Sequence, residues 1–425
     1  MAEQSSRMAR NIAIIRALTC LMFLMFAMTS DAVGSVIPKI IAEFHLSMKA
    51  ASAFQYAPMS AMALGALLLG MLADRLGRRR TIVIGLALYG VSSALFALGS
   101  TFGQFVALLA LEGLGVSVFK TGALALVGDV SNSTRQHTAL MNLLEGFFGI
   151  GSIIGPAIVA GLLADGLSWK WLYVIAAGVC ALLVALALIA EYPPERTQQR
   201  APAGLLPTLA LLKDPYALAF CTLISLYVAV EVAIYVWMPT YLGIYRGPLI
   251  AFVPYALAAF FALRAAGRLV GAWLLGRFSW TTALALLGAA IFVCFAGSLV
   301  GGPRTGLILL PLSGLFMSVI YPTINSKGIS GFVKAEHGRV SGLLLAFTAL
   351  AAALAPFAMG AVSDFYHSPR YGFVLASAFA LLLALGLAAN ALSGAATRRL
   401  QAMELSEYVA PGSPGRAAAT PVQTP

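Results

Sequence analysis

Apolar runs of roughly twenty residues recur along the chain, with short polar segments between them. About 20 apolar residues in a helix cross the hydrocarbon core of a bilayer, whereas membrane-spanning strands show alternating segments about ten residues long. The pattern therefore predicts an all-α membrane protein with twelve transmembrane helices. The predicted spans are residues 11–38, 48–72, 81–99, 102–127, 138–163, 171–190, 216–245, 249–275, 281–300, 306–326, 338–362 and 371–393.

A polar segment rich in proline separates the first six apolar runs from the last six. Residues 191–215 carry mixed charges and several prolines, and they contain no run long enough to span a bilayer. We therefore expect an N-terminal six-helix bundle at 1–190, a cytoplasmic linker at 191–215 and a C-terminal six-helix bundle at 216–393. Residues 394–425 are rich in Gly, Pro, Ala and Thr with scattered charge, and we expect a disordered cytoplasmic tail there.

The two halves repeat a short motif at corresponding positions. Gly155-Pro156, followed by Asp165, has its counterpart in Ala355-Pro356, followed by Asp364. Glycine and proline could recur by chance in glycine-rich helices, but the matching place within each half favours duplication. Internal duplication predicts two pseudo-symmetric bundles.

Composition agrees with a membrane protein and adds an orientation. The chain is 60% hydrophobic and only 10% charged, with a formal net charge of +11. Most basic residues fall in alternate loops, and cytoplasmic loops carry the excess of Lys and Arg. This places the loop at 70–80 and both termini in the cytoplasm, in a multi-pass protein of the cell (inner) membrane. The basic charge is then accounted for by orientation and anionic lipid, without nucleic acid.

The loop between the second and third spans carries a family signature. Its sequence is Gly70-Met-Leu-Ala-Asp-Arg-Leu-Gly-Arg-Arg-Arg80, and these glycines, Asp74 and the arginines at these spacings resemble the major facilitator superfamily. The resemblance implies two six-helix bundles around a central cavity, solute transport by alternating access, and no enzymatic activity. We expect Asp74 to dock at the N-terminus of the eleventh span, where the helix dipole favours an anion. The predicted conformational latch comprises Gly70, Asp74, Arg75, Gly77, Arg78 and Arg339.

Two spans also resemble one branch of that superfamily. Met141–Pro156 and Leu226–Tyr241 are similar to the fifth and seventh helices of the fucose and glucose/galactose permeases, which implies proton-coupled uptake of a sugar. Lys120, however, stands before Thr121-Gly122, where that branch carries an acidic residue. Drug–proton antiporters carry an arginine where this chain has Leu109. Transport of an organic anion or a drug, by uptake or efflux, is therefore the alternative.

Ionisable side chains inside the spans are the candidate functional residues, because at bilayer depth they usually face a cavity or a partner. The side chain of Asp31 is expected either to face a cavity or to form a hydrogen bond to a neighbouring helix. Lys120 needs an anion, which Glu145, Asp31, Glu112 or the substrate could supply, and Arg264 fits a counter-ion within the C-terminal half. The predicted substrate and proton cavity comprises Asp31, Glu112, Lys120, Asn142, Glu145, Tyr227, Glu231, Tyr235, Trp237, Tyr321 and Asn325.

Spacing along the helices supports this set. Tyr227 and Tyr235 lie four residues on either side of Glu231, so the three side chains share a helix face, and tyrosine rings and hydroxyls suit a sugar. Asn142 and Glu145 lie on one polar stripe, although contact with water at the cytoplasmic end would also account for them.

No pattern indicates catalysis or a bound cofactor. The four histidines are scattered in or beside loops, the four cysteines lie inside apolar runs, and no nucleotide-binding loop is present. We therefore expect no metal and no cofactor. The expected partners are a small-molecule substrate, a coupling ion, which we expect to be H⁺ although the sequence leaves Na⁺ open, and the lipid bilayer, with the chain acting as a monomer.

Overall fold

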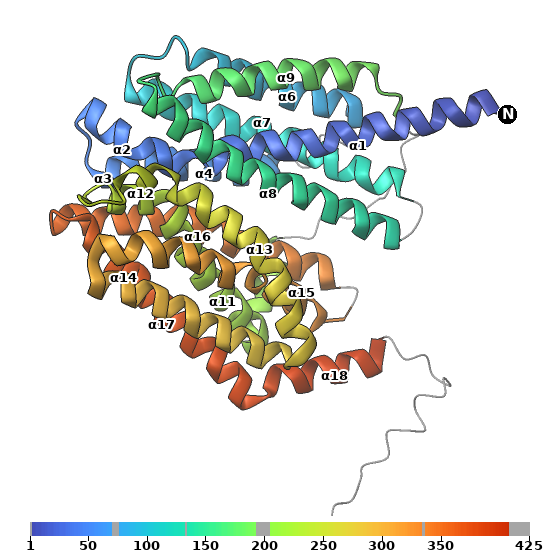
Figure 1. Ribbon diagram of the computed structural model, residues 1–425. Helices are drawn as coiled ribbons and strands as arrows, with labels where there is room; N and C mark the ends of the chain where they lie inside the picture. The colour runs from blue at the N-terminus through green and yellow to red at the C-terminus, as the bar shows by residue number, and fades with distance from the viewer. Residues whose placement is uncertain (1, 70–75, 132–133, 193–204, 334–335, 408–425) are drawn as a thin grey trace, which may run out of the picture.

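A computed structural model describes residues 2–69, 76–131, 134–192, 205–333 and 336–407, and these residues fold almost entirely into helices (Figure 1). A helix occupies each of the twelve segments predicted from the apolar runs. Nine helical stretches of the described chain are long and apolar enough to cross a membrane. One of these, Trp280–Ser330, contains two predicted spans. The all-helical membrane fold is confirmed.

The N-terminal half consists of helices that pack mainly on one another, with α7 against α4 and α6, and α8 against α1. In lipid, such packing depends on close van der Waals contact between helices, because the surrounding lipid is as apolar as the side chains. The helices of this half are α1 (Ala2–Ser30), α2 (Val33–Phe44), α3 (Met48–Ala51), α4 (Ala53–Leu69), α6 (Arg78–Leu95), α7 (Phe102–Val130), α8 (Thr134–Ala164) and α9 (Trp171–Ile189).

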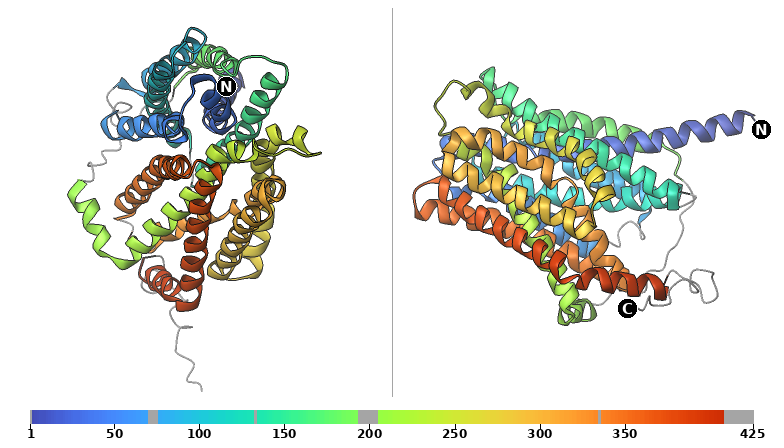
Figure 2. Two further views of the ribbon diagram at one scale, coloured as in Figure 1. Left: turned by 90° about the vertical axis from the view of Figure 1, so that its left-hand side faces the viewer. Right: turned by 60° about the horizontal axis from the view of Figure 1, so that its bottom comes forward.

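The C-terminal half repeats this arrangement, with α14 against α13 and α17, and α11 against α16 (Figure 2). Its elements are α10 (Leu205–Ala210), η1 (Leu211–Lys213), α11 (Pro215–Val232), the π-helical turn η2 (Ala233–Trp237), α12 (Met238–Leu242), η3 (Ile250–Tyr255), α13 (Ala256–Arg277), α14 (Trp280–Met317), α15 (Ile320–Ser330), α16 (His337–Phe365), α17 (Pro369–Ser393) and α18 (Ala395–Glu407).

Several predicted spans are interrupted rather than continuous. The first breaks after Ser30, the seventh contains η2, and the tenth breaks between Met317 and Ile320. Gly302 has a φ of 69°, a left-handed value that glycine adopts without strain, and it joins the ninth and tenth predicted spans inside α14. Breaks in membrane helices free backbone polar groups, so they occur where protein or a cavity surrounds them.

The two halves meet along α2, α3 and α4 on one side and η2, α12 and α16 on the other, and also where α8 packs on α13. Contact is very close at Gly34, where a Cβ atom would lie 1.9 Å from the backbone oxygen of Tyr235. Asp364, at the end of α16, accepts hydrogen bonds of 2.8 Å from the backbone N–H groups of Met48 and Lys49, which begin α3. These contacts lie at the end of the molecule that the sequence predicts to face outward.

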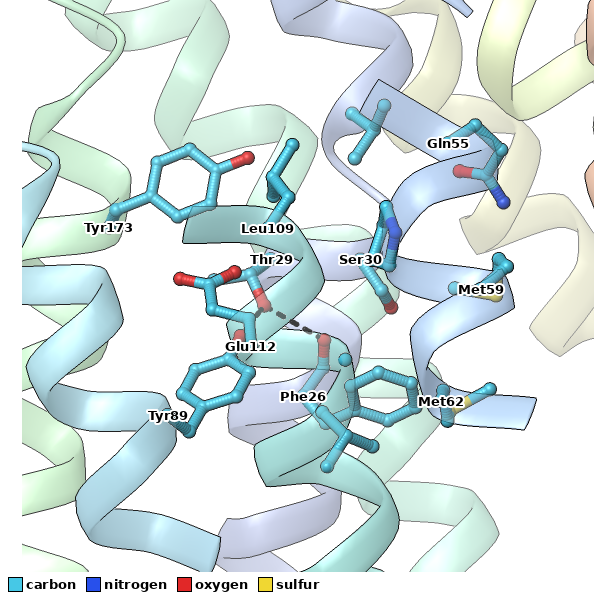
Figure 3. A pocket seen from close by; sticks show the side chains of 14 residues that line it. Phe26, Thr29, Ser30, Gln55, Met59, Met62, Tyr89, Leu109, Glu112 and Tyr173 are labelled. Atoms are coloured by element: carbon cyan, nitrogen blue, oxygen red, sulfur yellow. Dashed lines mark hydrogen bonds between the residues drawn. The ribbon is translucent and has the colours of Figure 1, made fainter. Parts of the chain in front are cut away.

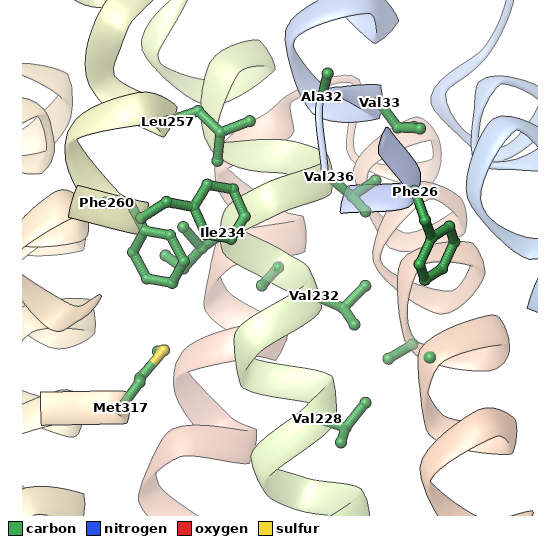
Figure 4. Close-up of a cluster of buried hydrophobic side chains, with 14 of the residues drawn as sticks. Phe26, Ala32, Val33, Val228, Val232, Ile234, Val236, Leu257, Phe260 and Met317 are labelled. Atoms are coloured by element: carbon green, nitrogen blue, oxygen red, sulfur yellow. The ribbon is translucent and has the colours of Figure 1, made fainter. Parts of the chain in front are cut away.

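Buried apolar side chains fill this interface (Figure 4). Val236 of η2 lies next to Ala32 and Val33 of the N-terminal half, while Ile234 lies with Phe260 inside the C-terminal half. The π-helical turn therefore presents neighbouring residues to both halves. A π-helical turn inside an α-helix is rare and frequently marks a functional site.

The expectation of a disordered tail from residue 394 is wrong for its first part. Ala395–Glu407 form α18, and Arg399 anchors it with hydrogen bonds of 2.9 and 2.7 Å to both carboxylate oxygens of Asp214. The guanidinium group of Arg399 also stacks on Tyr216 and Phe332, 4.6 Å from each ring centroid. These contacts join α18 to residues far away in the sequence, which the composition of the tail does not reveal.

Candidate functional site

Asp31 lies at the break between α1 and α2, facing α8. Its Oδ2 atom accepts a 2.5 Å hydrogen bond from Ser152 Oγ of α8, and its Oδ1 atom accepts a 3.1 Å bond from Ser30 Oγ. Asp31 is half-buried and makes no direct ion pair within the described chain. Hydroxyl groups therefore hold both carboxylate oxygens of Asp31.

Glu231 of α11 pairs directly with Arg264 of α13 in the C-terminal half. The side chains are 11% and 28% exposed, respectively, so the pair is largely removed from solvent. Arg264 is also close enough to interact electrostatically with Asp31 across the interface. The expectation that Arg264 acts as a counter-ion within the C-terminal half is confirmed, and its partner is Glu231.

Lys120 of α7 has Asp31 and Glu145 as its electrostatic neighbours. No direct ion pair to Lys120 is found among the described residues. Its ammonium group instead lies over the rings of Phe23 and Phe26, 5.5 and 5.2 Å from their centroids. The negative face of an aromatic ring attracts a cation, so these rings partly replace the missing anion.

These five residues form a cluster of opposite charges between the two halves, which we call the central charged cluster. It contains three acidic side chains and two basic ones, and it joins helices α1, α7, α8, α11 and α13. Electrostatic interactions link its members across the interface. Its members are Asp31, Lys120, Glu145, Glu231 and Arg264.

Tyrosines border this cluster. Tyr227 is buried and its hydroxyl donates a 3.0 Å hydrogen bond to the backbone oxygen of Met317. Its ring centroid lies 6.0 Å from that of Tyr321, which is half-buried and interacts electrostatically with Glu145 and Glu231. The Tyr235 hydroxyl accepts a 3.4 Å hydrogen bond from Gln55 Nε2 of α4, which connects the two halves.

The family model of the Major Facilitator Superfamily matches residues 19–356 of this chain. The chain belongs to this superfamily. It is therefore a multi-pass membrane protein and a secondary transporter, not an enzyme.

Individual members of the superfamily that resemble this chain transport different solutes. The L-fucose-proton symporter of Escherichia coli (strain K12) is 24% identical over 405 residues, which cover 85% of this chain and 90% of the symporter. A multidrug transporter protein, MdtP of Bacillus subtilis (strain 168), is 28% identical over 176 residues, and that alignment covers 41% of this chain and 31% of MdtP. The crystal structure of the nucleoside transporter NupG matches with a TM-score of 0.73 at 18% identity, covering 89% of this chain and 98% of NupG. The superfamily is established by the family model, and these likenesses do not decide the branch.

Within this superfamily fold, two of the predicted cavity residues lie away from the central charged cluster. Trp237 is 2% exposed, and its indole N–H donates a 3.1 Å hydrogen bond to the backbone oxygen of Pro356, inside the C-terminal half. The π-helical turn η2 includes Trp237, so its side chain does not point where a regular α-helix would direct it. Glu112 is buried inside the N-terminal half and accepts a 2.6 Å hydrogen bond from Ser93 Oγ.

The remaining cavity candidates are placed as follows. Asn142 and Glu145 are both exposed on α8, consistent with their common stripe, and Glu145 belongs to the central charged cluster. Asn325 is half-buried on α15. In the described part of the chain, no group of histidine, cysteine and acidic side chains has the geometry of a metal site.

The predicted latch is only partly described. Gly70, Asp74 and Arg75 lie outside the described residues, so the docking of Asp74 on the eleventh span stays a prediction. Gly77 begins α6 with a φ of 82°, and the buried Arg78 donates a 3.0 Å hydrogen bond to Asp129 of α7. Arg339 pairs at 3.5 Å with Glu336, one turn earlier.

Sequence reasoning missed Gln55, Phe23 and Phe26, which contact Tyr235 or Lys120. Glutamine carries no charge to mark it within an apolar run, and phenylalanine is common in any membrane helix. The available signal was Lys120. A lysine inside a span that has no acidic side chain in direct contact needs aromatic or polar neighbours.

Proposed function

We propose that this transporter moves a small neutral polar solute, a sugar by its likeness to the L-fucose-proton symporter, together with a proton. The proposed location is the cell (inner) membrane with both termini in the cytoplasm, and the proposed direction is import. Solute and proton would bind between the two halves, and the halves would rock to expose this site alternately to each side.

The charge balance of the central charged cluster carries this proposal. Glu231 is paired with Arg264, and Lys120 faces Asp31 and Glu145. When Asp31 carries a proton, the charges of the two remaining acidic side chains and the two basic side chains cancel. A charge-balanced site of this kind suits an uncharged solute and disfavours an anion. Without that proton, the cluster carries one negative charge, which resists movement through a low-dielectric interior.

Asp31 is the proposed proton carrier within this cluster. Its carboxylate is held by the hydroxyl groups of Ser30 and Ser152, and it interacts with Arg264 of the opposite half. A proton on Asp31 therefore changes the attraction between the two halves. This links proton binding to the rocking motion that transport requires.

Lys120 supports a second candidate function, the transport of an organic anion. Its ammonium group has aromatic neighbours but no direct ion pair in the described chain, so a substrate carboxylate could supply the anion. In that case Lys120→Met would abolish uptake, whereas uptake of a neutral sugar would continue at a reduced rate.

An uptake screen in proteoliposomes tests the two functions against each other. Radiolabelled L-fucose, D-galactose and D-glucose would be compared with mono- and dicarboxylates under an inward proton gradient, using wild type and Lys120→Met. We expect accumulation of at least one neutral sugar and of no carboxylate. Accumulation of carboxylates alone, lost in Lys120→Met, would establish the anion transporter instead.

A further inference from the structure

A small pocket inside the N-terminal half lies apart from the central charged cluster (Figure 3). We call it the Glu112 pocket. Most of its lining is apolar, and it has room for about two water molecules. Its polar lining consists of Thr29, Ser30, Gln55, Tyr89, Glu112 and Tyr173.

Glu112 enters this pocket from α7, and no cation neighbours it among the residues that the structure describes. Its Oε1 atom accepts the hydrogen bond from Ser93 of α6, and its electrostatic neighbours in the described chain are Tyr89, Tyr173 and Cys180. Figure 3 shows Glu112 between the rings of Tyr89 and Tyr173. Burying an ionised carboxylate without an opposite charge is very unfavourable, and such a group binds a proton instead.

Two further polar atoms of the pocket need a partner. The Tyr173 hydroxyl and Gln55 Oε1 are buried and have no hydrogen-bond partner within the described chain. Buried polar atoms beside a small cavity are usually satisfied by ordered water. The Tyr89 hydroxyl is already bonded to Thr29, so the pocket water would contact Glu112, Tyr173 and Gln55.

The far end of the pocket reaches the proposed proton carrier. Ser30 lines the pocket, and its hydroxyl donates a 3.1 Å hydrogen bond to Asp31 Oδ1. With water in the pocket, Glu112, that water and the Ser30 hydroxyl would form a row of groups that can both give and take a proton, ending at Asp31.

We propose that Glu112 is a second proton-binding group of this transporter, and that it exchanges its proton with Asp31 through pocket water and Ser30. The inference rests on the proposed proton coupling. In the exchange, the Ser30 hydroxyl passes its proton to Asp31 and receives one from pocket water, which takes one from Glu112. One proton leaves Glu112 and one reaches Asp31, and no other bond changes.

Infrared difference spectroscopy of the purified protein in detergent tests the site without a substrate. A protonated buried carboxyl group gives a C=O stretching band separate from the amide bands. We expect Glu112→Gln to remove one such band at neutral pH, and Asp31→Asn, the matched control, to leave that band in place. A wild-type spectrum that lacks a band removed by Glu112→Gln would overturn the inference.

Ser93→Ala keeps the test decisive if Glu112→Gln does not fold. The variant retains the carboxyl group but removes its hydrogen-bond donor, so the same band should shift to higher frequency, a change that an ionised Glu112 does not produce. An unshifted band would contradict the assignment. Loss of the band when sodium chloride replaces choline chloride would show a sodium site instead and would also overturn the inference.

The result for Glu112 can be separated from the proposed function. Sugar-driven proton movement in proteoliposomes tests proton coupling itself. If that movement is present and the Glu112 band is absent, only the second proton site fails. If that movement is absent and the band is present, the proposed function fails.

Discussion

At the residue scale, the buried pair of Glu231 and Arg264 makes the sharpest stability prediction. Glu231→Gln leaves the guanidinium group without its anion. Breaking a fully buried pair costs about 3–5 kcal/mol, and we expect less here because Arg264 is 28% exposed. Thermal unfolding of the purified protein should show the loss.

The matched control is the double variant Glu231→Gln with Arg264→Leu. Removing both members of a buried pair is often close to neutral, so the double variant should regain most of the lost stability. Equal destabilisation of the single and the double variant would mean that the pair does not act as a unit.

The sequence predicted which charges lie in the spans better than it predicted how they pair. Asp31, Lys120 and Glu145 come together as expected, because an ionisable side chain in lipid must find a partner. Trp237 does not join them, because it lies in a π-helical turn and its indole N–H bonds to the Pro356 oxygen instead. A prediction from helical periodicity assumes 3.6 residues per turn, so it does not include a π-helical turn.

At the element scale, α18 depends on the ion pair between Arg399 and Asp214. Burial disfavours the charged form of Asp214, but its hydrogen bonds from Arg399 and from the Tyr216 backbone N–H together lower its pKa. Because the pKa of Asp214 is lower in the folded state, the ion pair stabilises the docking of α18 at pH values above the ordinary pKa of about 3.9. This stabilisation is lost as the pH falls through the lowered pKa.

Asp214→Asn should therefore weaken the docking of α18 at neutral pH, as acidification through the lowered pKa of Asp214 does in wild type. Both side chains are nearly a third exposed, so we expect a cost of about 1 kcal/mol. The mobility of a spin label on Gln401→Cys measures the docking of α18. Arg398→Ala, which removes an exposed neighbouring arginine, is the control and should leave the label immobile.

Equal mobility of the label in Asp214→Asn and wild type at neutral pH would contradict the role of this pair. The helix itself was missed because the tail was judged by its overall composition. Residues 395–407 contain good helix formers, whereas the glycine and proline that indicated disorder lie mostly beyond them.

At the scale of the whole molecule, the predicted outer end is closed by contacts between the halves that tolerate no added volume. Gly34→Val places a side chain where a Cβ atom would lie only 1.9 Å from the Tyr235 oxygen, so α2 and η2 must separate to an ordinary contact of at least 3.4 Å. We expect the two halves to move apart at this end.

Spin labels on Lys49→Cys and Tyr366→Cys measure that separation, since both residues are exposed and flank the contact of Asp364 with α3. The four native cysteines are buried, which limits background labelling. Gly161→Val is the control, because a Cβ atom at Gly161 meets nothing within 4 Å. An unchanged distance in Gly34→Val would show that this contact does not hold the outer end closed.

The overall architecture was predictable because membrane-spanning helices must be long and apolar. The arrangement of the two halves was predictable only through the repeated motif and the family signature. Contacts such as Gly34 with Tyr235, and Asp364 with the start of α3, join segments about 200 and 300 residues apart. Local sequence patterns do not show which distant backbone segment a glycine or a carboxylate will contact.

The central claim is that a neutral solute and a proton cross the membrane together through Asp31. Its most direct test is the external pH of weakly buffered proteoliposomes after L-fucose, D-galactose and D-glucose are added in turn without a pH gradient. The account predicts that a transported sugar makes the external medium more alkaline in wild type. In Asp31→Asn the pH should stay constant while labelled sugar still exchanges across the membrane. Entry of labelled sugar into wild-type vesicles with no change in external pH would contradict the account, as would undiminished proton movement in Asp31→Asn.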